Sequence, residues 1–170
     1  FKSLNDNIII NKIKNCNLVN IGISNKNQIQ KFYYNKKFKN NKFDLPVSSM
    51  GMHSMKFNQK IHKEHVFSNF VFMKYDFLIE NLGLDYPTHI FIDAYGAEDQ
   101  IIDSILSSSK KEILPKKIMV DIEESGIKRL ENSKIFKKLN QSNYKLKKYT
   151  FEKGSKDVPD SFKTIFENTL

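Results

Sequence analysis

Carboxylates that follow apolar runs are the residues of this sequence best placed to do chemistry. The run THIFID (88–93) closes on Asp93, and Glu98 and Asp99 follow after a short turn that contains a glycine. A second apolar run, KKIMVDIEE (116–124), also closes on acids. A carboxylate in such a position can orient a cofactor amine, accept a proton from a hydroxyl or hold a metal ion. These acids are therefore the first candidates for a functional site.

Asp93 has a second interpretation, as the cap of the helix that follows it. Asp shortly before a helix often caps its first turn, and negative charge in the first turn, as at Glu98 and Asp99, suits the helix dipole. Both interpretations of Asp93 are open at this point. The residues after these acids recur at helical spacing: Ile101, Ile102, Ile105 and Leu106.

Histidine supplies the other candidate for proton transfer. His53 lies in the loop-like stretch MGMHSM (50–55), and histidine is the side chain best suited to take up a proton at neutral pH. His62 and His65 flank Glu64 in HKEH, a spacing that would suit metal ligands on a helix. Because the sequence offers no evident third ligand, no metal site is predicted.

The elements that position these residues follow from the periodicity of the apolar residues. The strand 88–93 is apolar on both faces, which is typical of a buried parallel strand. Residues 1–14 suit the end of a helix, and further helices are expected over 75–82 up to Gly83, after Gly96 and over 132–139. Strands are expected over 16–24, 29–35, 66–73, 88–93, 116–124, 144–151 and 162–167.

This order of elements predicts an α/β fold with a mostly parallel sheet and an antiparallel pair at its C-terminal end. In open α/β sheets, ligands bind beyond the carboxyl ends of the parallel strands. Asp93 and the pair Asp121 and Glu123 are expected at such ends. They would therefore face one crevice.

The length and composition indicate one soluble domain over residues 1–170. With 39% hydrophobic residues the chain can bury one ordinary core. No stretch approaches the roughly 20 apolar residues of a membrane helix, and the start of the chain does not resemble a signal peptide. The single cysteine, Cys16, cannot form an internal disulfide. We expect a cytoplasmic location and no membrane span.

The net charge of +9 raises the question of a nucleic-acid partner. Lysine is abundant even in loop-like segments such as NKKFKNNK (35–42), which indicates a general compositional bias rather than a recognition patch. Nucleic acid is therefore not the expected partner. The basic segment KLKKY (145–149) alternates as a strand would, and it predicts Tyr144, Leu146 and Lys148 on one face and Lys145, Lys147 and Tyr149 on the other.

The segment NLGLDYPTHIFIDAYGAEDQIIDSIL (81–106) resembles the core signature of the FkbM family of S-adenosylmethionine-dependent methyltransferases. In that family a turn with proline leads into a strand of the form hIKIDVDGxE and then into a helix. Other segments resemble family elements in the same order: 1–24, 50–55, 116–124 and 161–168. The resemblance covers nearly the whole chain, with its specific part at 81–106, and it implies a class I methyltransferase-like (Rossmann-like) fold.

The resemblance also implies roles for residues and a cofactor, S-adenosylmethionine. It places Asp93 beside the methyl donor and acceptor, makes Glu98 the acid after the turn glycine, and puts His53 in a loop that closes over the substrate. These three are the predicted catalytic residues. The predicted cofactor-binding residues are Asp93 and the segment Gly22, Ile23 and Ser24, which would lie near the adenine.

Two kinds of departure from the family pattern stand out. Phe91 occupies a position where the family commonly has Lys, and Tyr95 one where it has Asp or Glu. The six glycines include no GxG pair, so the turn that lets a cofactor approach the backbone is absent. The first two strands of the fold are therefore expected upstream of this chain, and a degenerate or truncated gene product is the alternative. The chain alone is expected to bind S-adenosylmethionine weakly.

Three functions are compatible with these features. The resemblance implies O-methylation of a hydroxyl on a sugar or small metabolite. Positioning of the acceptor oxygen supplies much of the acceleration of such a transfer, with His53 as the base and Asp93 as the group that orients the acceptor. An RNA-binding or RNA-modifying protein is an alternative, motivated by Phe and Tyr among the lysines. A non-catalytic remnant of the fold that serves as an interaction module is another, motivated by Phe91, Tyr95 and the missing glycine turn. The sequence does not specify the methyl acceptor.

Overall fold

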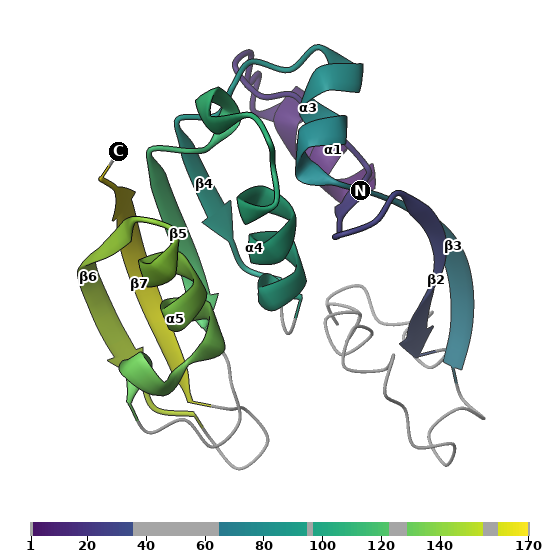
Figure 1. Ribbon diagram of the computed structural model, residues 1–170. Helices are drawn as coiled ribbons and strands as arrows, with labels where there is room; N and C mark the ends of the chain where they lie inside the picture. The colour runs from purple at the N-terminus through teal and green to yellow at the C-terminus, as the bar shows by residue number, and fades with distance from the viewer. Residues whose placement is uncertain (1, 36–64, 95–96, 123–128, 155–159, 170) are drawn as a thin grey trace.

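A computed structural model describes residues 2–35, 65–94, 97–122, 129–154 and 160–169 of the chain (Figure 1). These residues form a mixed α/β protein with two small sheets, each with both parallel and antiparallel strands. None of the helices in this part of the chain is long and apolar enough to cross a bilayer. The helices are α1 (Lys2–Ile10), α3 (Tyr75–Leu82), α4 (Glu98–Leu106) and α5 (Lys134–Gln141), and two 3₁₀ turns are η5 (Lys111–Ile113) and η6 (Leu130–Asn132).

The first sheet contains β1 (Gly22–Ile23), β2 (Gln28–Asn35) and β3 (His65–Met73) in the order β1-β3-β2. β1 is parallel to β3, whereas β2 and β3 form the long antiparallel pair on the right of Figure 1. The strand predicted over 16–24 is shorter than expected. Only its residues Gly22 and Ile23 pair with β3, and residues 16–21 precede the strand.

The second sheet contains β4 (His89–Ile92), β5 (Lys117–Ile122), β6 (Tyr144–Glu152) and β7 (Ser161–Asn168) in the order β4-β5-β7-β6. β4 is parallel to β5, and β7 is antiparallel to both β5 and β6. It follows that β4, β5 and β6 point the same way and β7 points the opposite way. The predicted antiparallel pair at the C-terminal end is confirmed. The described strands belong to two mixed sheets, however, rather than to the single mostly parallel sheet that was predicted.

Helices α4 and α5 lie on the same face of the second sheet (Figure 1). Burial alternates along β5: Ile118, Val120 and Ile122 are buried, whereas the residues between them are only partly buried. The buried set packs with apolar residues of the two helices, including Ile102 and Leu139. The core therefore lies between this face and the helices, and the alternate residues of each strand belong to the opposite face.

Two buried tyrosines connect elements around this core. The Tyr75 hydroxyl donates to the carbonyl of Ile113 at 2.6 Å, and the Tyr75 N–H donates to Ser104 Oγ at 2.8 Å. The Tyr144 hydroxyl donates to the carbonyl of Pro115 at 2.7 Å. Burial raises the pKa of the Tyr75 hydroxyl, and burial raises that of Tyr144 to about 12. Both hydroxyls stay neutral donors at physiological pH, and they hold α3 and β6 against the segment before β5.

The environment of β4 differs from the prediction. The strand is parallel to β5 as predicted, but it is the edge of its sheet, and Phe91 is 66% exposed. Only Ile92 is buried, while His89 is exposed and Ile90 is half-buried. The prediction that β4 is buried on both faces is therefore wrong for the described chain. An apolar sequence allows a strand to be buried on both faces. Burial also requires other elements to cover both faces, and the strand's own sequence does not indicate whether they are present.

A β-bulge in β6 overturns the predicted alternation of its lysines. The register with β7 shifts between Leu146 and Lys148, which leaves Lys147 as the extra residue. Lys148 pairs with Ile165, on the face opposite the helices, and Lys147 forms an ion pair with Glu167 on that same face. Two consecutive lysines therefore lie on one face, because the bulge breaks the two-residue period.

Candidate functional site

Two acids lie at the carboxyl ends of the parallel strands β4 and β5. Asp93 directly follows Ile92, the last residue of β4, and its side chain is exposed. Asp121 is the last residue but one of β5 and is partly buried. Ile92 and Val120 are register partners in these strands, so Asp93 and Asp121 come next at the same edge of the sheet. The structure thus brings together the strand-end acids that the sequence singled out.

Asp93 is not the cap of α4. That helix begins at Glu98 and its N-cap is Ala97, which has no side-chain hydrogen bond to offer. Among the residues that the structure describes, no hydrogen bond joins the Asp93 side chain to the first turn of α4. The alternative in which Asp93 serves only as a cap is therefore not supported.

Glu98 has a contact that explains its position. Its side chain is only 3% exposed, and Oε1 accepts a hydrogen bond from the N–H of Ala94 at 3.1 Å. This bond joins the first residue of α4 to the chain just after β4, and it satisfies a main-chain donor where the chain leaves the sheet. Glu98 therefore fixes the backbone next to Asp93. Its predicted catalytic role stays a prediction.

Asp121 is the acid with the most perturbed environment at this edge. Burial raises its pKa, whereas a hydrogen bond from Ser161 and the charge of Lys163 lower it, and the charges of Asp93 and Glu152 raise it further. The net shift is upward. The Oδ1 atom is buried and has no hydrogen-bond partner within the described parts of the chain. An acid with a raised pKa beside an exposed carboxylate is a candidate for proton transfer.

Asp121→Asn is expected to stabilise the protein at neutral pH. The pKa of Asp121 is higher in the folded state than in the unfolded state. Its contribution to the free energy of unfolding is therefore most favourable below the unfolded pKa of about 4, where the acid is protonated in both states. That contribution is lost as the pH rises through the folded pKa. The amide should therefore add about 1 kcal/mol to the free energy of unfolding at pH 7.5, after allowance for solvent screening. Urea unfolding at pH 7.5 and pH 4 measures this difference.

Asp85→Asn is the matched control for this prediction. Asp85 is an exposed acid in the loop before β4, so the same chemical change there should leave the pH dependence unaltered. A loss of stability in Asp121→Asn at neutral pH would contradict the prediction. It would mean that Ser161 and Lys163 stabilise the ionised carboxylate more than burial disfavours it.

The predicted cofactor segment Gly22, Ile23 and Ser24 is tightly packed. A Cβ built on Gly22 would lie 2.4 Å from the ring of Phe72. Ser24 is 1% exposed, and its N–H donates to the carbonyl of Met73 at 2.9 Å. Ile23 packs against the core. The space beside this segment is thus occupied by the protein itself. No described hydrogen bond or ion pair connects it with Asp93.

Several predicted residues lie outside the described part of the chain. These are His53, Glu123, Tyr95 and the turn glycine Gly96. Within the described residues, no group of three or more His, Cys, Asp or Glu side chains is arranged to hold a metal ion.

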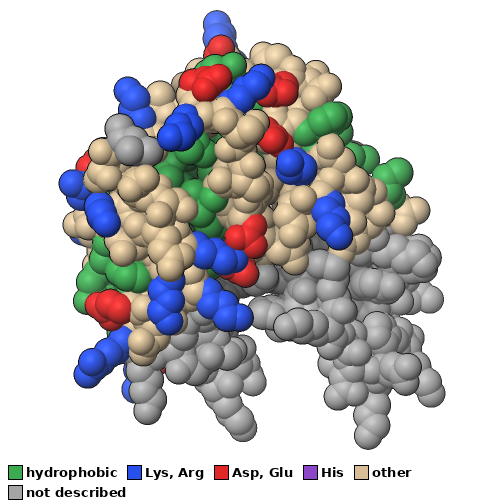
Figure 2. All heavy atoms as spheres, viewed as in Figure 1, with side chains coloured by type: hydrophobic (Ala, Val, Ile, Leu, Met, Phe, Trp, Pro, Cys, Tyr) green, Lys and Arg blue, Asp and Glu red, His purple; other side chains and the backbone are tan. Residues whose placement is uncertain are grey.

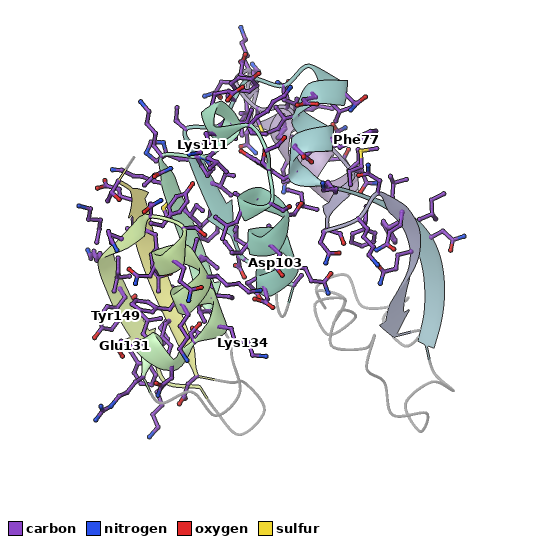
Figure 3. The ribbon with its side chains drawn as sticks, in the orientation of Figure 1. Phe77, Asp103, Lys111, Glu131, Lys134 and Tyr149 are labelled. Carbon is purple, nitrogen blue, oxygen red and sulfur yellow. The ribbon has the colours of Figure 1, made fainter. Side chains whose placement is uncertain are left out.

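A cluster of charges fixes α4 against α5. Lys138 Nζ of α5 contacts Asp99 Oδ1 at 2.7 Å and Asp103 Oδ1 at 2.6 Å, and Asp103 is labelled on α4 in Figure 3. Burial would lower the pKa of Lys138, but hydrogen bonds to both acids raise it, and the net shift is upward. Asp99 is therefore part of a structural ion pair rather than of the acid pair at the strand ends.

A cavity of about 290 Å³ lies over the middle of the second sheet. Its lining includes Phe91 of β4, Met119 and Asp121 of β5, Ile165 of β7 and Lys148 of β6. Sequence reasoning did not identify this cavity. It depends on the register of four strands and on the bulge in β6, and neither can be read from apolar periodicity.

Comparisons with known proteins add no relative. No family model matches the chain, and no curated protein or solved structure matches it significantly.

Proposed function

We propose that this protein is an S-adenosylmethionine-dependent O-methyltransferase of the FkbM type, cytoplasmic, which acts on a hydroxyl of a sugar or small metabolite. One observation carries the proposal. Asp93 is an exposed carboxylate directly after β4, and Asp121 is at the neighbouring position near the end of the parallel strand β5. Ligands of open α/β sheets bind at such strand ends.

The direction of the strands supports the same proposal. β4, β5 and β6 point one way, and β7 is reversed and lies between β5 and β6. A reversed C-terminal strand beside strands of one direction is what the family resemblance implies for this part of the fold. In addition, α4 and α5 lie on one face of the second sheet (Figure 1). Asp93 and Asp121 are at the carboxyl ends of β4 and β5.

The proposed cofactor fits one part of the predicted binding set. Asp93 is an exposed carboxylate that accepts hydrogen bonds from an amine or from hydroxyl groups. Gly22 does not fit as a cradle for a ligand, because the Phe72 ring fills the space where its Cβ would be. When bound, S-adenosylmethionine supplies an electrophilic methyl group. The chain's own acids must then provide the remaining chemistry.

The two acids suit different tasks in methyl transfer to a hydroxyl. Asp121 has the raised pKa of a group that takes up a proton closer to neutral pH, so it is the proposed proton acceptor, alongside His53. Asp93 is exposed and orients the acceptor. Glu98 positions Asp93 through its bond to the Ala94 N–H. Two carboxylates in one site can take different roles when their environments give them different pKa values.

The proposal is tested by measuring transfer of a labelled methyl group from S-adenosylmethionine by the full-length protein. The acceptors are a panel of free sugars, glycans and small hydroxylated metabolites, with RNA as a separate arm. Transfer to at least one hydroxylated acceptor, at a rate that falls as the acids are protonated, is the expected result. Transfer to RNA alone, or no transfer together with no binding of S-adenosylmethionine, would overturn the proposal.

A non-catalytic interaction module is the second candidate. It is favoured by Phe91, which stands in an apolar row of the sheet rather than adding a charge beside the acids. The packing of Gly22 on Phe72 points in the same direction. This candidate predicts normal folding and no methyl transfer from any donor, so the same assay separates it from the first.

An RNA-binding role is less well supported by the distribution of charge. Figure 2 shows Lys and Arg side chains spread over the visible face of the described residues, with Asp and Glu among them. Lysines of the second sheet are also paired with acids: Lys117 and Lys147 with Glu167, and Lys163 with Glu152. Such pairs leave less positive charge for phosphate groups.

A further inference from the structure

A row of four side chains crosses the second sheet on the face opposite α4 and α5. Phe91 of β4 pairs with Met119 of β5, Met119 pairs with Ile165 of β7, and Ile165 pairs with Lys148 of β6. We call this set the open row. Three strand spacings separate its ends, which makes it about 14 Å long. It is apolar over three strands and ends in a cation.

The open row is accessible and concave. Phe91 is 66% exposed, while Met119 and Ile165 are half-buried and form the floor. The cavity of about 290 Å³ described above lies over these residues. This volume is at the lower end of the range for sites that bind small molecules. The exposed apolar surface would be stabilised by contact with an apolar ligand, at about 25 cal/mol for each Å² buried.

Charge at the two ends of the open row is opposite. On either side of the row, Lys163 is paired with Glu152 at 2.7 Å and Lys117 with Glu167 at 2.9 Å. Lys148 has no ion-pair partner among the residues that the structure describes. At the other end, Asp93 follows β4 two residues after Phe91 and is exposed, with Asp121 nearby.

This distribution decides the orientation of a charged ligand. A negative head group is attracted to Lys148 at the β6 end and repelled by the acids at the β4 end. A positive head group would prefer the acids and would leave Lys148 beside its apolar tail. The open row therefore complements a molecule with one negative end and a long apolar body.

We propose that the open row binds one elongated apolar molecule with a single anionic head group, of the class of medium-chain carboxylates. The head group contacts Lys148, and the chain lies across Ile165, Met119 and Phe91. This site lies over the middle of the sheet, and the inference does not depend on methyl transfer.

The experiment is an NMR titration of the full chain with decanoate, below its micelle concentration, with labelled methionine and isoleucine methyl groups. The methyl signals of Met119 and Ile165 should shift and saturate at one ligand per chain. Lys148→Met should weaken decanoate binding about five-fold through loss of a part-exposed ion pair. Phe91→Ala should weaken it by a similar factor through loss of apolar contact. Both side chains are exposed, so neither change should unfold the protein.

Lys145→Met is the matched control, because Lys145 is an exposed lysine of β6 that does not line the cavity. It should leave decanoate affinity unchanged, and decyltrimethylammonium should bind more weakly than decanoate to the original protein. Equal binding of the cation, or equal effects of Lys145→Met and Lys148→Met, would overturn the proposal. So would methyl shifts that follow protein concentration and do not respond to decanoate, because the row would then be a contact between two copies of the chain.

Discussion

Asp93→Asn in the full-length protein is expected to lower methyl transfer by about 10²-fold, the effect of losing a group that positions the acceptor hydroxyl. Folding should be nearly unaffected. Asp93 is exposed, α4 takes Ala97 rather than Asp93 as its N-cap, and Glu98 holds the neighbouring Ala94 N–H. The amide keeps the shape of the side chain but removes its charge. Initial rates of methyl transfer and thermal unfolding of the same preparations give the two readouts.

Asp85→Asn serves as the control for this prediction, since it makes the same change at an exposed acid before β4. It should leave both rate and stability unaltered. Full activity in Asp93→Asn would show that the carboxylate takes no part in transfer. A loss of several kcal/mol in the free energy of unfolding would show instead that Asp93 is structural.

Phe91 adds a second use of the same assays. Phe91→Lys introduces the residue type that the proposed FkbM family commonly has two residues before the strand-end acid. A site that lost activity through this replacement should gain transfer, whereas the decanoate site should be weakened because the open row loses its exposed ring. The two proposals therefore respond in opposite directions to one substitution.

The positions of most helices and strands followed from local pattern. The helix predicted over 75–82 is α3, and Gly83 ends it with a left-handed backbone at φ 58°. The strands predicted at 29–35 and 66–73 are β2 and β3 within one residue at each end. Periodicity and glycine both act on neighbouring residues, so a single sequence carries enough information to locate these elements.

The pairing of strands could not be predicted in the same way. An alternating or apolar run shows that a strand forms, but it does not name the partner or its direction. The sequence therefore indicated one mostly parallel sheet, and the described chain has two mixed sheets. The bulge at Lys147 had no signal in the pattern KLKKY, because alternation in a sequence assumes an unbroken register.

The candidate site was predictable only where it depends on local sequence. Asp93 and Asp121 could be expected at one edge because each ends an apolar strand. Their environments could not, since the burial of Asp121 and its hydrogen bond from Ser161 depend on β7, a strand forty residues later in the chain. Glu98 was identified as an acid of interest, but its bond to the Ala94 N–H could not be read from the sequence.

Gly22→Ala is expected to destabilise the protein by about 1–3 kcal/mol through overpacking. The added methyl group would meet the Phe72 ring at 2.4 Å, well inside van der Waals contact, and Phe72 is buried at 7% exposure. Gly22 and Phe72 are register partners in β1 and β3, so neither backbone can move away without loss of the short β1 pairing. Urea unfolding of the single variants measures the cost.

A double-mutant cycle with Phe72→Leu then separates packing from cofactor binding at this glycine. If the ring is the obstacle, the smaller side chain should relieve the clash, and the two changes should show a coupling energy above about 0.5 kcal/mol. Gly83→Ala is the control, because its cost of about 1 kcal/mol comes from the positive φ and no atom lies within 4 Å of the new Cβ. That cost should simply add to the effect of Phe72→Leu. Additive costs at Gly22 and Phe72 would contradict the packing explanation, and a stable Gly22→Ala protein that no longer binds S-adenosylmethionine would return Gly22 to the cofactor site.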